Sequence, residues 1–406
     1  MRIIHVYDGH ERVFPGEGSV PSIVYYLARY TAEKSHDVTV LERRWTGTDY
    51  EEEIDGIKFI RFDLNICSNV SNKDIAPALI KKPKGLMRFV LDRIIFALKA
   101  NKYLKQNDFD VIHVHLPFAA NILVTINKRL RNKMVYTAHI GEEKKRLALD
   151  SSAPLVLKLF SPDLYLMKRV KKSVVLNGPL KEKLINKRIE EEKLEVIPNG
   201  IDVNEFNMSK EEVKRVKRKY GIDNSKVVVM FSGSISPRKG VIHLVKAIEM
   251  IDDDRIFLLI VGNPNVDREY AKIVMDYLKK KNINAKFTGF VPYGDLKALY
   301  SACDVFVLPS LEEGFGVVLT EALASGKPLI GSNVGGIPAQ IKDGWNGFLV
   351  EPGNEKQLAE KIRYLIDNPE ERERMGENSR KLAREEFDWE KIAERYLEVY
   401  EEIVRQ

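Results

Sequence analysis

Residues 310–328 read Ser310-Leu-Glu-Glu-Gly-Phe-Gly-Val-Val-Leu-Thr-Glu-Ala-Leu-Ala-Ser-Gly-Lys-Pro328. The apolar run just before them, residues 304–308, is typical of a buried strand, and a helix is predicted to begin at residue 315 or 316. Glu313 then lies on the loop between strand and helix, and Glu321 lies about five residues into the helix. The stretch is therefore predicted to be one strand-to-helix connection of an α/β fold.

The same alternation of short apolar runs and helical segments recurs in both halves of the chain. Strands are predicted over residues 2–7, 37–41, 57–62, 110–114 and 134–137, and then over 227–231, 256–261, 286–288, 304–308 and 328–330. Such strands, separated by helices, indicate parallel sheets covered on both faces. We predict an α/β protein with two Rossmann-like, doubly wound domains, residues 1–190 and 191–386. A last helix is predicted over residues 387–406, with Asp388 as its N-cap.

The composition describes a globular chain without obvious export or membrane signals. At 406 residues, with 44% hydrophobic and 31% charged residues, the chain is long enough for two cores. Two cysteines, Cys67 and Cys303, are too few for a disulfide framework or a structural zinc site. The N-terminus resembles a strand rather than a signal peptide, and no apolar run reaches the roughly 18 residues that span a bilayer. The expected location is cytoplasmic.

The net charge of +6 is unevenly distributed. Residues 81–188 contain 24 Lys and Arg against 8 Asp and Glu, whereas residues 201–406 contain 31 against 34. An anionic partner for the first half is one interpretation, and a solvated lysine-rich surface is the other. Residues 86–99 form a basic, apolar helix that either touches an anionic membrane face or packs on the sheet with its cations extended to water. Peripheral contact with the inner membrane face is therefore one expectation, and no nucleic-acid partner is expected.

Two glycine-containing loops follow predicted strands. Gly16-Glu-Gly18-Ser-Val-Pro21 resembles a dinucleotide-binding loop, but it begins too far from the strand and has Pro21 in place of the third glycine. It is either a loop whose N–H groups approach a phosphate or a plain flexible loop. The second loop, residues 231–240, contains Gly233, Arg238 and Lys239. Two cations beside glycines favour phosphate binding over a simple basic turn.

Two patterns that suggest metal sites are weak. Asp252-Asp-Asp254 resembles the Asp-x-Asp metal motif, but it precedes a predicted strand, at the wrong end for a ligand site, so turn-forming acids are the favoured interpretation. His113 and His115 share one strand face without a carboxylate or thiol cluster, and we predict buried or cleft-facing polar residues. No cofactor or metal is expected.

The glutamate pair is better suited to holding a substrate than to acid–base chemistry. The N–H groups of residues 315–319 would favour a diphosphate at the start of the helix. Carboxylates match the vicinal hydroxyls of a sugar or ribose, and nothing in the sequence indicates the raised pKa that a glycosidase acid needs. Ligands of parallel sheets bind beyond the carboxyl ends of the strands, so a cleft between the two domains is the expected site. We predict that Glu313 and Glu321 bracket a sugar–diphosphate–ribose molecule.

At this point the chain resembles the retaining glycosyltransferases of the GT-B superfamily, family 4. The resemblance covers nearly the whole length, and its most specific part is Glu313-x7-Glu321 within residues 309–328. Further matching segments are residues 197–202 with Phe206, Gly335-Gly336, Asp343-Gly344 with residues 347–350, and the helix at Trp389.

The resemblance implies roles for particular residues. Glu321 would bind the ribose, Lys239 and Arg238 would neutralise the diphosphate, and the last helix would pack back on the first domain. Glu313 would hold the transferred sugar together with the N–H groups of Phe315, Gly316, Val317 and Val318. His139, which by residue chemistry alone would be an ordinary polar loop residue, matches the family histidine that contacts the donor sugar.

The implied activity is metal-independent, retaining transfer of a hexosyl unit in carbohydrate biosynthesis. The donor would be a UDP-, GDP- or ADP-sugar, and the acceptor a hydroxyl compound, for which an anionic or lipid-linked molecule is one expectation. The family usually has an arginine at the position of Ser234. Either Arg238 takes over the role of that arginine, or the affinity for the donor is weak. The alternatives are a non-catalytic sugar-nucleotide sensor and, using Gly16 to Pro21, an NAD-dependent oxidoreductase.

Overall fold

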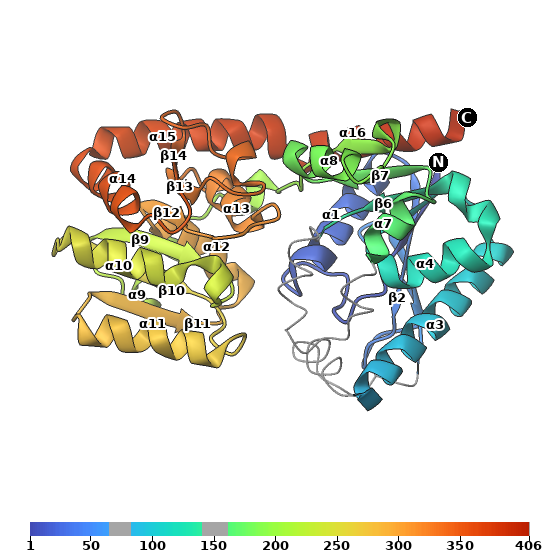
Figure 1. Cartoon of the computed structure of the whole chain (residues 1–406), viewed down its shortest axis with the longest axis horizontal. Coiled ribbons are helices and arrows are strands. Elements are labelled where there is room, and N and C mark those ends of the chain that lie inside the picture. Colours follow the sequence, from blue (N-terminus) through green and yellow to red (C-terminus); the bar gives the residue numbers. More distant parts are fainter. Residues whose placement is uncertain (65–82, 140–160, 406) are drawn as a thin grey trace. The chain divides into compact units, whose positions relative to one another are not determined.

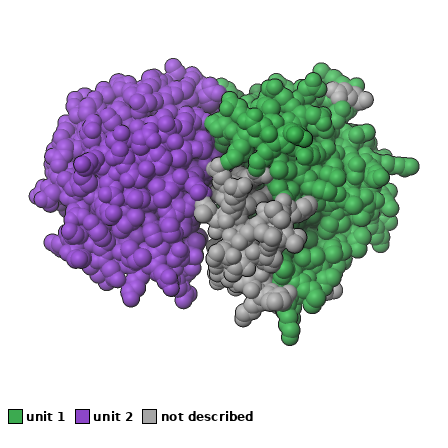
Figure 2. Space-filling view, in the orientation of Figure 1, with its two compact units in different colours: residues 1–198, 389–406 green, residues 199–388 purple. Residues whose placement is uncertain are grey.

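The computed structural model describes residues 1–64, 83–139 and 161–405, and the chain folds into two compact units. Unit 1 comprises Met1–Pro198 and Trp389–Gln406, and unit 2 comprises Asn199–Asp388 (Figure 2). Cys67 and residues 140–160 of the basic stretch lie outside the described residues. In the described part of the chain, every helix is too short or too polar to cross a bilayer.

Unit 1 is built on an eight-stranded sheet in the order β3-β4-β2-β1-β5-β6-β7-β8 (Figure 1). Its strands are β1 Arg2–Val6, β2 Asp37–Arg43, β3 Glu51–Ile54, β4 Ile57–Phe62, β5 Val111–Val114, β6 Met134–Thr137, β7 Lys172–Val175 and β8 Leu194–Val196. All neighbouring pairs are parallel except β3 with β4, which are antiparallel. The helices are α1 Ser19–Glu33, α3 Pro83–Gln106, α4 Pro117–Ile126, α7 Pro162–Met167, α8 Gly178–Ile185 and α16 Trp389–Arg405.

Unit 2 has a wholly parallel six-stranded sheet in the order β11-β10-β9-β12-β13-β14. Its strands are β9 Val227–Ser232, β10 Ile256–Val261, β11 Ala285–Gly289, β12 Val305–Leu308, β13 Leu329–Ser332 and β14 Gly347–Val350. The helices are α9 Lys210–Tyr220, α10 Val241–Ile251, α11 Arg268–Lys280, α12 Tyr293–Ala302, α13 Val317–Ala324, α14 Glu355–Asp367 and α15 Pro369–Leu382. Short helical turns are η1 Lys128–Lys133, η2 Glu191–Lys193, η3 Val203–Phe206, η4 Pro237–Lys239, η5 Ile337–Ala339 and η6 Ala383–Phe387.

The predicted fold class is confirmed, because both units are parallel-sheet α/β structures. β10 and β12 are buried at every position, as expected for strands covered on both faces. Each predicted strand is present within one or two residues of its predicted bounds. The strands β3, β7, β8 and β14 were not predicted.

The C-terminal helix α16 belongs to unit 1. Trp389 at its start stacks on Tyr26 of α1, with ring centroids 6.0 Å apart, and Glu394 pairs with Lys34 at 2.7 Å. Further along, Tyr396 and Tyr400 are buried. The helix therefore covers part of α1 and of the unit 1 sheet with its aromatic face.

Candidate functional site

The connection from β12 to α13 carries Glu313, whose carboxylate is held on both oxygens. Its Oε2 accepts a hydrogen bond from Lys239 Nζ and lies 3.4 Å from the Ser310 hydroxyl. Its Oε1 accepts from the backbone N–H of Gly314 at 3.1 Å and lies 3.9 Å from the guanidinium of Arg238. Glu313 is 8% exposed and Lys239 7% exposed, so the two form a largely desolvated ion pair.

The two cations lie on the connection from β9 to α10. Since β9 and β12 are neighbours in a parallel sheet, the loops after them lie side by side. The Arg238 backbone oxygen accepts from the Leu311 N–H at 2.8 Å, and the Arg238 guanidinium donates to the Glu312 backbone oxygen at 3.0 Å. Hydrogen bonds to backbone oxygens therefore hold the two loops together, in addition to the ion pair between Lys239 and Glu313.

Glycines allow these loops to approach so closely. Gly240 has φ +63°, and a Cβ there would lie 2.0 Å from the Pro309 backbone oxygen. Gly335, after β13, has φ +56°, and its Cβ would lie 1.7 Å from the backbone oxygen of Glu313. A side chain at either position would both strain the backbone and push the Glu313 loop away.

Helix α13 presents its positive end at the same edge. Gly316 is its N-cap at φ +85° and has no side chain that could cap the first turn. The buried amide of Gln340 donates to the Phe315 backbone oxygen at 2.5 Å and accepts from the Thr320 hydroxyl at 3.1 Å, which fixes the start of the helix. The N–H groups of Val317 and Val318 therefore belong to a rigid, positively polarised turn.

Glu321 lies within α13 and is 8% exposed. Its Oε2 accepts a hydrogen bond of 2.7 Å from the hydroxyl of Tyr300 on α12. Burial raises the pKa of Glu321 to about 7, although the hydrogen bond from Tyr300 acts in the opposite direction. The carboxyl group is therefore balanced between its two protonation states near neutral pH.

The predicted site residues of unit 2 come together at the carboxyl edge of its sheet. They are Gly233, Arg238, Lys239, Glu313, Phe315, Gly316, Val317, Val318 and Glu321, and a Cβ on Gly233 would lie 3.8 Å from the Lys239 side chain. Sequence reasoning missed Tyr300 and Gln340. Both act through packing between elements distant in the chain, which no local pattern indicates.

In unit 1, His139 follows β6 and is 7% exposed. Its Nε2 lies 3.0 Å from Nδ1 of His115, whose Nε2 in turn lies 2.9 Å from Nδ1 of His5. His113 hydrogen-bonds to Thr137 at 2.7 Å and to Tyr400 at 2.6 Å. His5, His113 and His115 lie close enough together that they could in principle bind a metal ion. However, His5 and His115 hydrogen-bond to each other, and His113 hydrogen-bonds to hydroxyl groups. Among the described residues, no carboxylate belongs to this group.

The loop with Gly16 and Gly18 precedes α1, as predicted. Gly16 has φ +83°, and its N–H donates to the hydroxyl of Ser22 at 3.2 Å. Glu42, the acid that a dinucleotide site would need, is buried and accepts from Arg61 at 2.8 Å and from the Val13 N–H at 2.9 Å. Both oxygens of Glu42 are thus engaged by the protein, which argues against the oxidoreductase alternative.

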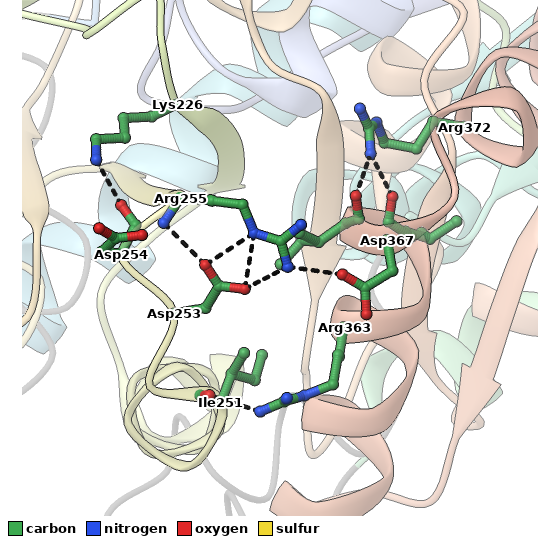
Figure 3. Close-up of polar contacts among 10 residues, drawn as sticks. Lys226, Ile251, Asp253, Asp254, Arg255, Arg363, Asp367 and Arg372 are labelled. Atoms are coloured by element: carbon green, nitrogen blue, oxygen red, sulfur yellow. Dashed lines mark hydrogen bonds and ion pairs between the residues drawn. The ribbon is translucent and has the colours of Figure 1, made fainter.

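The acids 252–254 form a turn between α10 and β10 (Figure 3). Asp253 binds Arg255, which also reaches Asp367 at 2.6 Å, and the backbone oxygen of Asp254 accepts from Lys226 at 2.7 Å. Asp252 adopts a left-handed conformation as the C-cap of α10. Turn formation and ion pairing account for these residues at the amino end of the strand.

Unit 2 also has an open pocket of about 610 Å³ lined by residues of α9 together with Ser301, Lys327 and Arg380. Ser301 precedes β12 and Lys327 precedes β13, so the pocket lies at the amino ends of the strands. This is the edge opposite to the glutamate pair, and parallel α/β sheets bind their ligands at the other edge.

Two family models match the chain. Residues 212–382 match Glycosyl transferases group 1, and residues 20–205 match Glycosyltransferase Family 4. An uncharacterized glycosyltransferase of Methanocaldococcus jannaschii is 33% identical over 212 residues, which are 52% of this chain and about half, 54%, of that relative. Another uncharacterized glycosyltransferase of the same organism is 28% identical over 87% of this chain and 93% of its own length.

Solved structures share the fold over the whole chain. Sucrose-phosphate synthase from Thermosynechococcus elongatus has a TM-score of 0.80 at 20% identity and covers 99% of both chains. HepE of Anabaena, in complex with UDP-glucose, has a TM-score of 0.72 at 19% identity, over 99% of this chain and 100% of that one. With two glycosyltransferase models covering its two units in turn, this chain belongs to the family 4, group 1 glycosyltransferases and has the GT-B fold.

Proposed function

We propose that the chain is a retaining, metal-independent hexosyltransferase that uses a nucleotide-diphosphate sugar as donor. The observation that carries the proposal is the edge of unit 2, where Lys239, Arg238 and the N-terminus of α13 surround Glu313, with Glu321 nearby on the same helix. Positive groups beside a pair of acids suit a molecule whose centre is anionic and whose two ends carry hydroxyls. A nucleotide-diphosphate sugar has this order of charges.

Each end of the donor is assigned to one acid. Glu321 accepts from the ribose hydroxyls, and Glu313 with the N–H groups of Phe315 to Val318 holds the transferred sugar. Lys239 and Arg238 stabilise the diphosphate as it departs, in place of a divalent cation. The described complex of HepE with UDP-glucose, on a similar fold, supports a donor of this class.

The chemical step needs charge stabilisation more than a strong base. The bond from the sugar C1 to the diphosphate oxygen breaks, and a new bond forms from C1 to the acceptor oxygen on the same face. We assign the acceptor's proton to the departing phosphate, and we propose that His139 of unit 1 contacts the donor sugar. Gly16 and Gly18 are assigned to substrate binding, with the acceptor on unit 1.

A ligand panel tests the proposal. Thermal unfolding is followed with UDP, GDP, ADP, NAD and the matching sugar nucleotides, each with EDTA and with Mg²⁺. We expect one nucleotide diphosphate to raise the melting temperature equally in EDTA, and the matching sugar nucleotide to be consumed when an acceptor is supplied. Stabilisation by NAD alone would contradict the proposal, whereas binding without hydrolysis or transfer would favour the sugar-nucleotide sensor.

We also propose that unit 1 touches an anionic membrane surface through α3. Four apolar residues of this helix are exposed, Met87 at 60%, Leu98 at 53%, Val90 at 47% and Leu91 at 43%. The cations Lys84, Arg88, Lys99, Lys102 and Lys105 are also exposed on it. An exposed apolar stripe flanked by cations is the arrangement that binds anionic lipid.

Sedimentation with anionic phosphatidylglycerol vesicles tests this contact. Met87→Ser is expected to reduce vesicle binding severalfold at low salt, because a buried apolar contact is lost. Met250→Ser is the matched control, since Met250 is a similarly exposed methionine of unit 2, at 48%. Equal sedimentation of wild type with neutral and anionic vesicles, or no sedimentation at all, would remove the proposal.

A further inference from the structure

The open pocket of unit 2 at the amino ends of the strands is strongly cationic. Of the fourteen described residues that line it, one is an acid, Glu212, and five are lysines or arginines. The five cations are Lys210, Lys214, Lys217, Lys327 and Arg380. Glu212 already serves its own helix, because its Oε2 accepts from the Ser209 N–H at 2.9 Å and from the Ser209 hydroxyl at 2.7 Å in a capping box. The pocket therefore offers a surplus of positive charge to a ligand.

Helix α9 carries cations on two faces, and the two sets have different surroundings. On one face, Arg215 and Lys219 donate to the carboxylate of Asp295 on α12 at 2.8 and 2.5 Å. The face toward the pocket carries three lysines spaced four and three residues apart, Lys210, Lys214 and Lys217. Among the described residues, no carboxylate lies within ion-pair distance of these three lysines. Like charges at such spacings destabilise a helix, so a bound anion would relieve their repulsion.

The other two cations of the pocket are held in place by backbone oxygens. Lys327, just before β13, donates from Nζ to the Ser301 backbone oxygen at 2.9 Å. Arg380 of α15 donates to the backbone oxygen of Ser325, the C-cap of α13, at 3.3 Å. Gly326 has φ +66°, and a Cβ there would lie 3.1 Å from Nε of Arg380, so a side chain would displace the guanidinium. An ammonium group has three N–H donors and a guanidinium five, so both cations are fixed and still have donors for a ligand.

The pocket is separate from the donor site proposed above. Ser301 and Lys327 precede β12 and β13, whereas Lys239 and Glu313 follow β9 and β12 at the carboxyl edge. Ligands bind at the carboxyl edge when strand-to-helix loops build the site. This pocket is built mainly by the side of α9, so that preference does not apply to it. A ligand here would be additional to the donor, and its binding does not depend on the proposed function.

We propose that this pocket binds a small molecule with at least two phosphate groups. Its cations come from α9, from the segment before β13 and from α15, and such a spread suits more than one anionic group. Asn207 and Asn224 add neutral amides that match hydroxyl groups, so a phosphorylated sugar is the expected class. The volume of about 610 Å³ lies in the range of small-molecule sites. The concave shape suits such a molecule better than a flat membrane surface.

Calorimetric titration of the full chain with fructose 1,6-bisphosphate at low salt tests the proposal, with fructose as the uncharged reference. We expect saturable binding of the bisphosphate, weakened as salt is added, and no binding of fructose. Lys214→Gln and Lys327→Gln should each weaken binding about tenfold, the scale of one hydrogen bond to a charged group. Lys272→Gln is the matched control, because Lys272 is an exposed lysine of α11 in the same unit and lies outside the pocket.

Lys239→Ala separates the pocket from the carboxyl edge, and it should leave binding of the bisphosphate in place. Loss of binding in Lys239→Ala together with full binding in Lys214→Gln would assign the bisphosphate to the carboxyl edge and overturn the proposal. Equal weakening by Lys214→Gln and Lys272→Gln would reduce the effect to general surface charge and would equally contradict it. Absence of binding, or tighter binding of polyglutamate than of the bisphosphate, would remove the assigned ligand class.

The melting temperature of the ligand-free protein shows whether a variant with weaker binding is still folded. Lys214 is exposed, and glutamine has nearly the same helix propensity as lysine. Because Lys214→Gln removes repulsion within the lysine face, it should melt at or slightly above the wild-type temperature at low salt. The same concentration of bisphosphate should then raise the melting temperature of wild type more than that of Lys214→Gln. An equal rise in both proteins would contradict the assignment to this pocket.

Discussion

The site residues at the carboxyl edge of the unit 2 sheet are charged, whereas β1 and β5 of the unit 1 sheet carry a cluster of neutral histidines beside ion pairs such as Asp8 with Arg93. In unit 2, Lys239, Arg238 and Glu313 share one network at the ends of β9 and β12. In unit 1, His5 lies on β1, His113 lies on β5 and His115 directly follows β5, and burial lowers the pKa values of all three. In both units these side chains lie on or after neighbouring parallel strands, so the difference lies in the side chains themselves.

This contrast indicates a division of labour. The charged edge of unit 2 is suited to a charged ligand. When a diphosphate binds, Lys239 must exchange its ion pair with Glu313 for one with the diphosphate. A cluster of neutral histidines provides hydrogen bonds without the cost of burying a charge. The following predictions change one edge at a time, or one residue within an edge, to see whether the contrast has the consequences we assign to it.

The largest effect is expected from Lys239→Ala. Loss of this cation removes charge stabilisation of the departing diphosphate and removes from buried Glu313 the cation that hydrogen-bonds to it, so turnover should fall about 100- to 1000-fold. Turnover is measured as the rate at which nucleotide diphosphate is released. Lys246→Ala is the control, because Lys246 lies on α10 in the same unit but pairs with Glu355. Turnover of Lys239→Ala within twofold of wild type would show that the charged edge is structural only.

A second substitution tests the glycine packing behind that edge. Gly335→Ala should weaken binding of a nucleotide diphosphate more than tenfold, because its Cβ would collide with the Glu313 loop. Gly344→Ala is a close control: its φ of +74° carries a similar left-handed strain of about 1–2 kcal/mol, but no atom lies within 4 Å of its Cβ. Calorimetric titration of both variants separates strain from collision. Equal binding by the two variants would contradict the role given to Gly335.

Much of this arrangement was predictable from sequence, for a physical reason. Continuous apolar runs such as β10 can be satisfied only between two helical layers, so the parallel sheets followed from them. Lys239 and Glu313 were each predicted from a local loop pattern. Their contact additionally requires β9 and β12 to be neighbours, although β10 and β11 separate them in the chain.

The parts that escaped prediction depend on tertiary packing. β3, with the sequence Glu-Glu-Glu-Ile, is an exposed antiparallel edge strand and has no apolar run to reveal it. Tyr300 lies in the last turn of α12, and only the structure shows that its hydroxyl donates to Glu321. The links from His5 to His115 and on to His139 likewise appear only once β1, β5 and β6 are adjacent.

The pH dependence of donor binding tests Glu321. Its pKa is raised from 4.5 to about 7, so between these values the free protein holds a proton that an unfolded chain would have released. This contribution to stability is lost as the pH rises through about 7. If the ribose hydroxyls donate to the ionised carboxylate, affinity should rise about tenfold from pH 6 to pH 8.

Calorimetry with a sugar nucleotide is the appropriate measurement, because its diphosphate carries no terminal phosphate that titrates in this range. Binding should release protons at pH 6, as shown by its dependence on the ionisation enthalpy of the buffer. Glu321→Gln should bind more weakly and with little pH dependence. An affinity that is constant from pH 6 to pH 8 in wild type would place the ribose elsewhere or leave Glu321 protonated in the complex.

The smallest effect is expected from Tyr300→Phe, which removes one hydroxyl from the charged edge and nothing else. The hydrogen bond from Tyr300 lowers the pKa of Glu321, so its loss should move the midpoint of the pH dependence to higher pH. At pH 7 the affinity for the sugar nucleotide should fall about threefold to tenfold, because less carboxylate is present and its orientation is less restricted. Tyr277→Phe is the matched control, since Tyr277 also donates to a glutamate, Glu249, but on the helices α11 and α10. If Tyr300→Phe lowers the affinity without moving the midpoint, Tyr300 orients Glu321 but does not change its pKa. If neither the affinity nor the midpoint changes, the contact between Tyr300 and Glu321 has no part in donor binding.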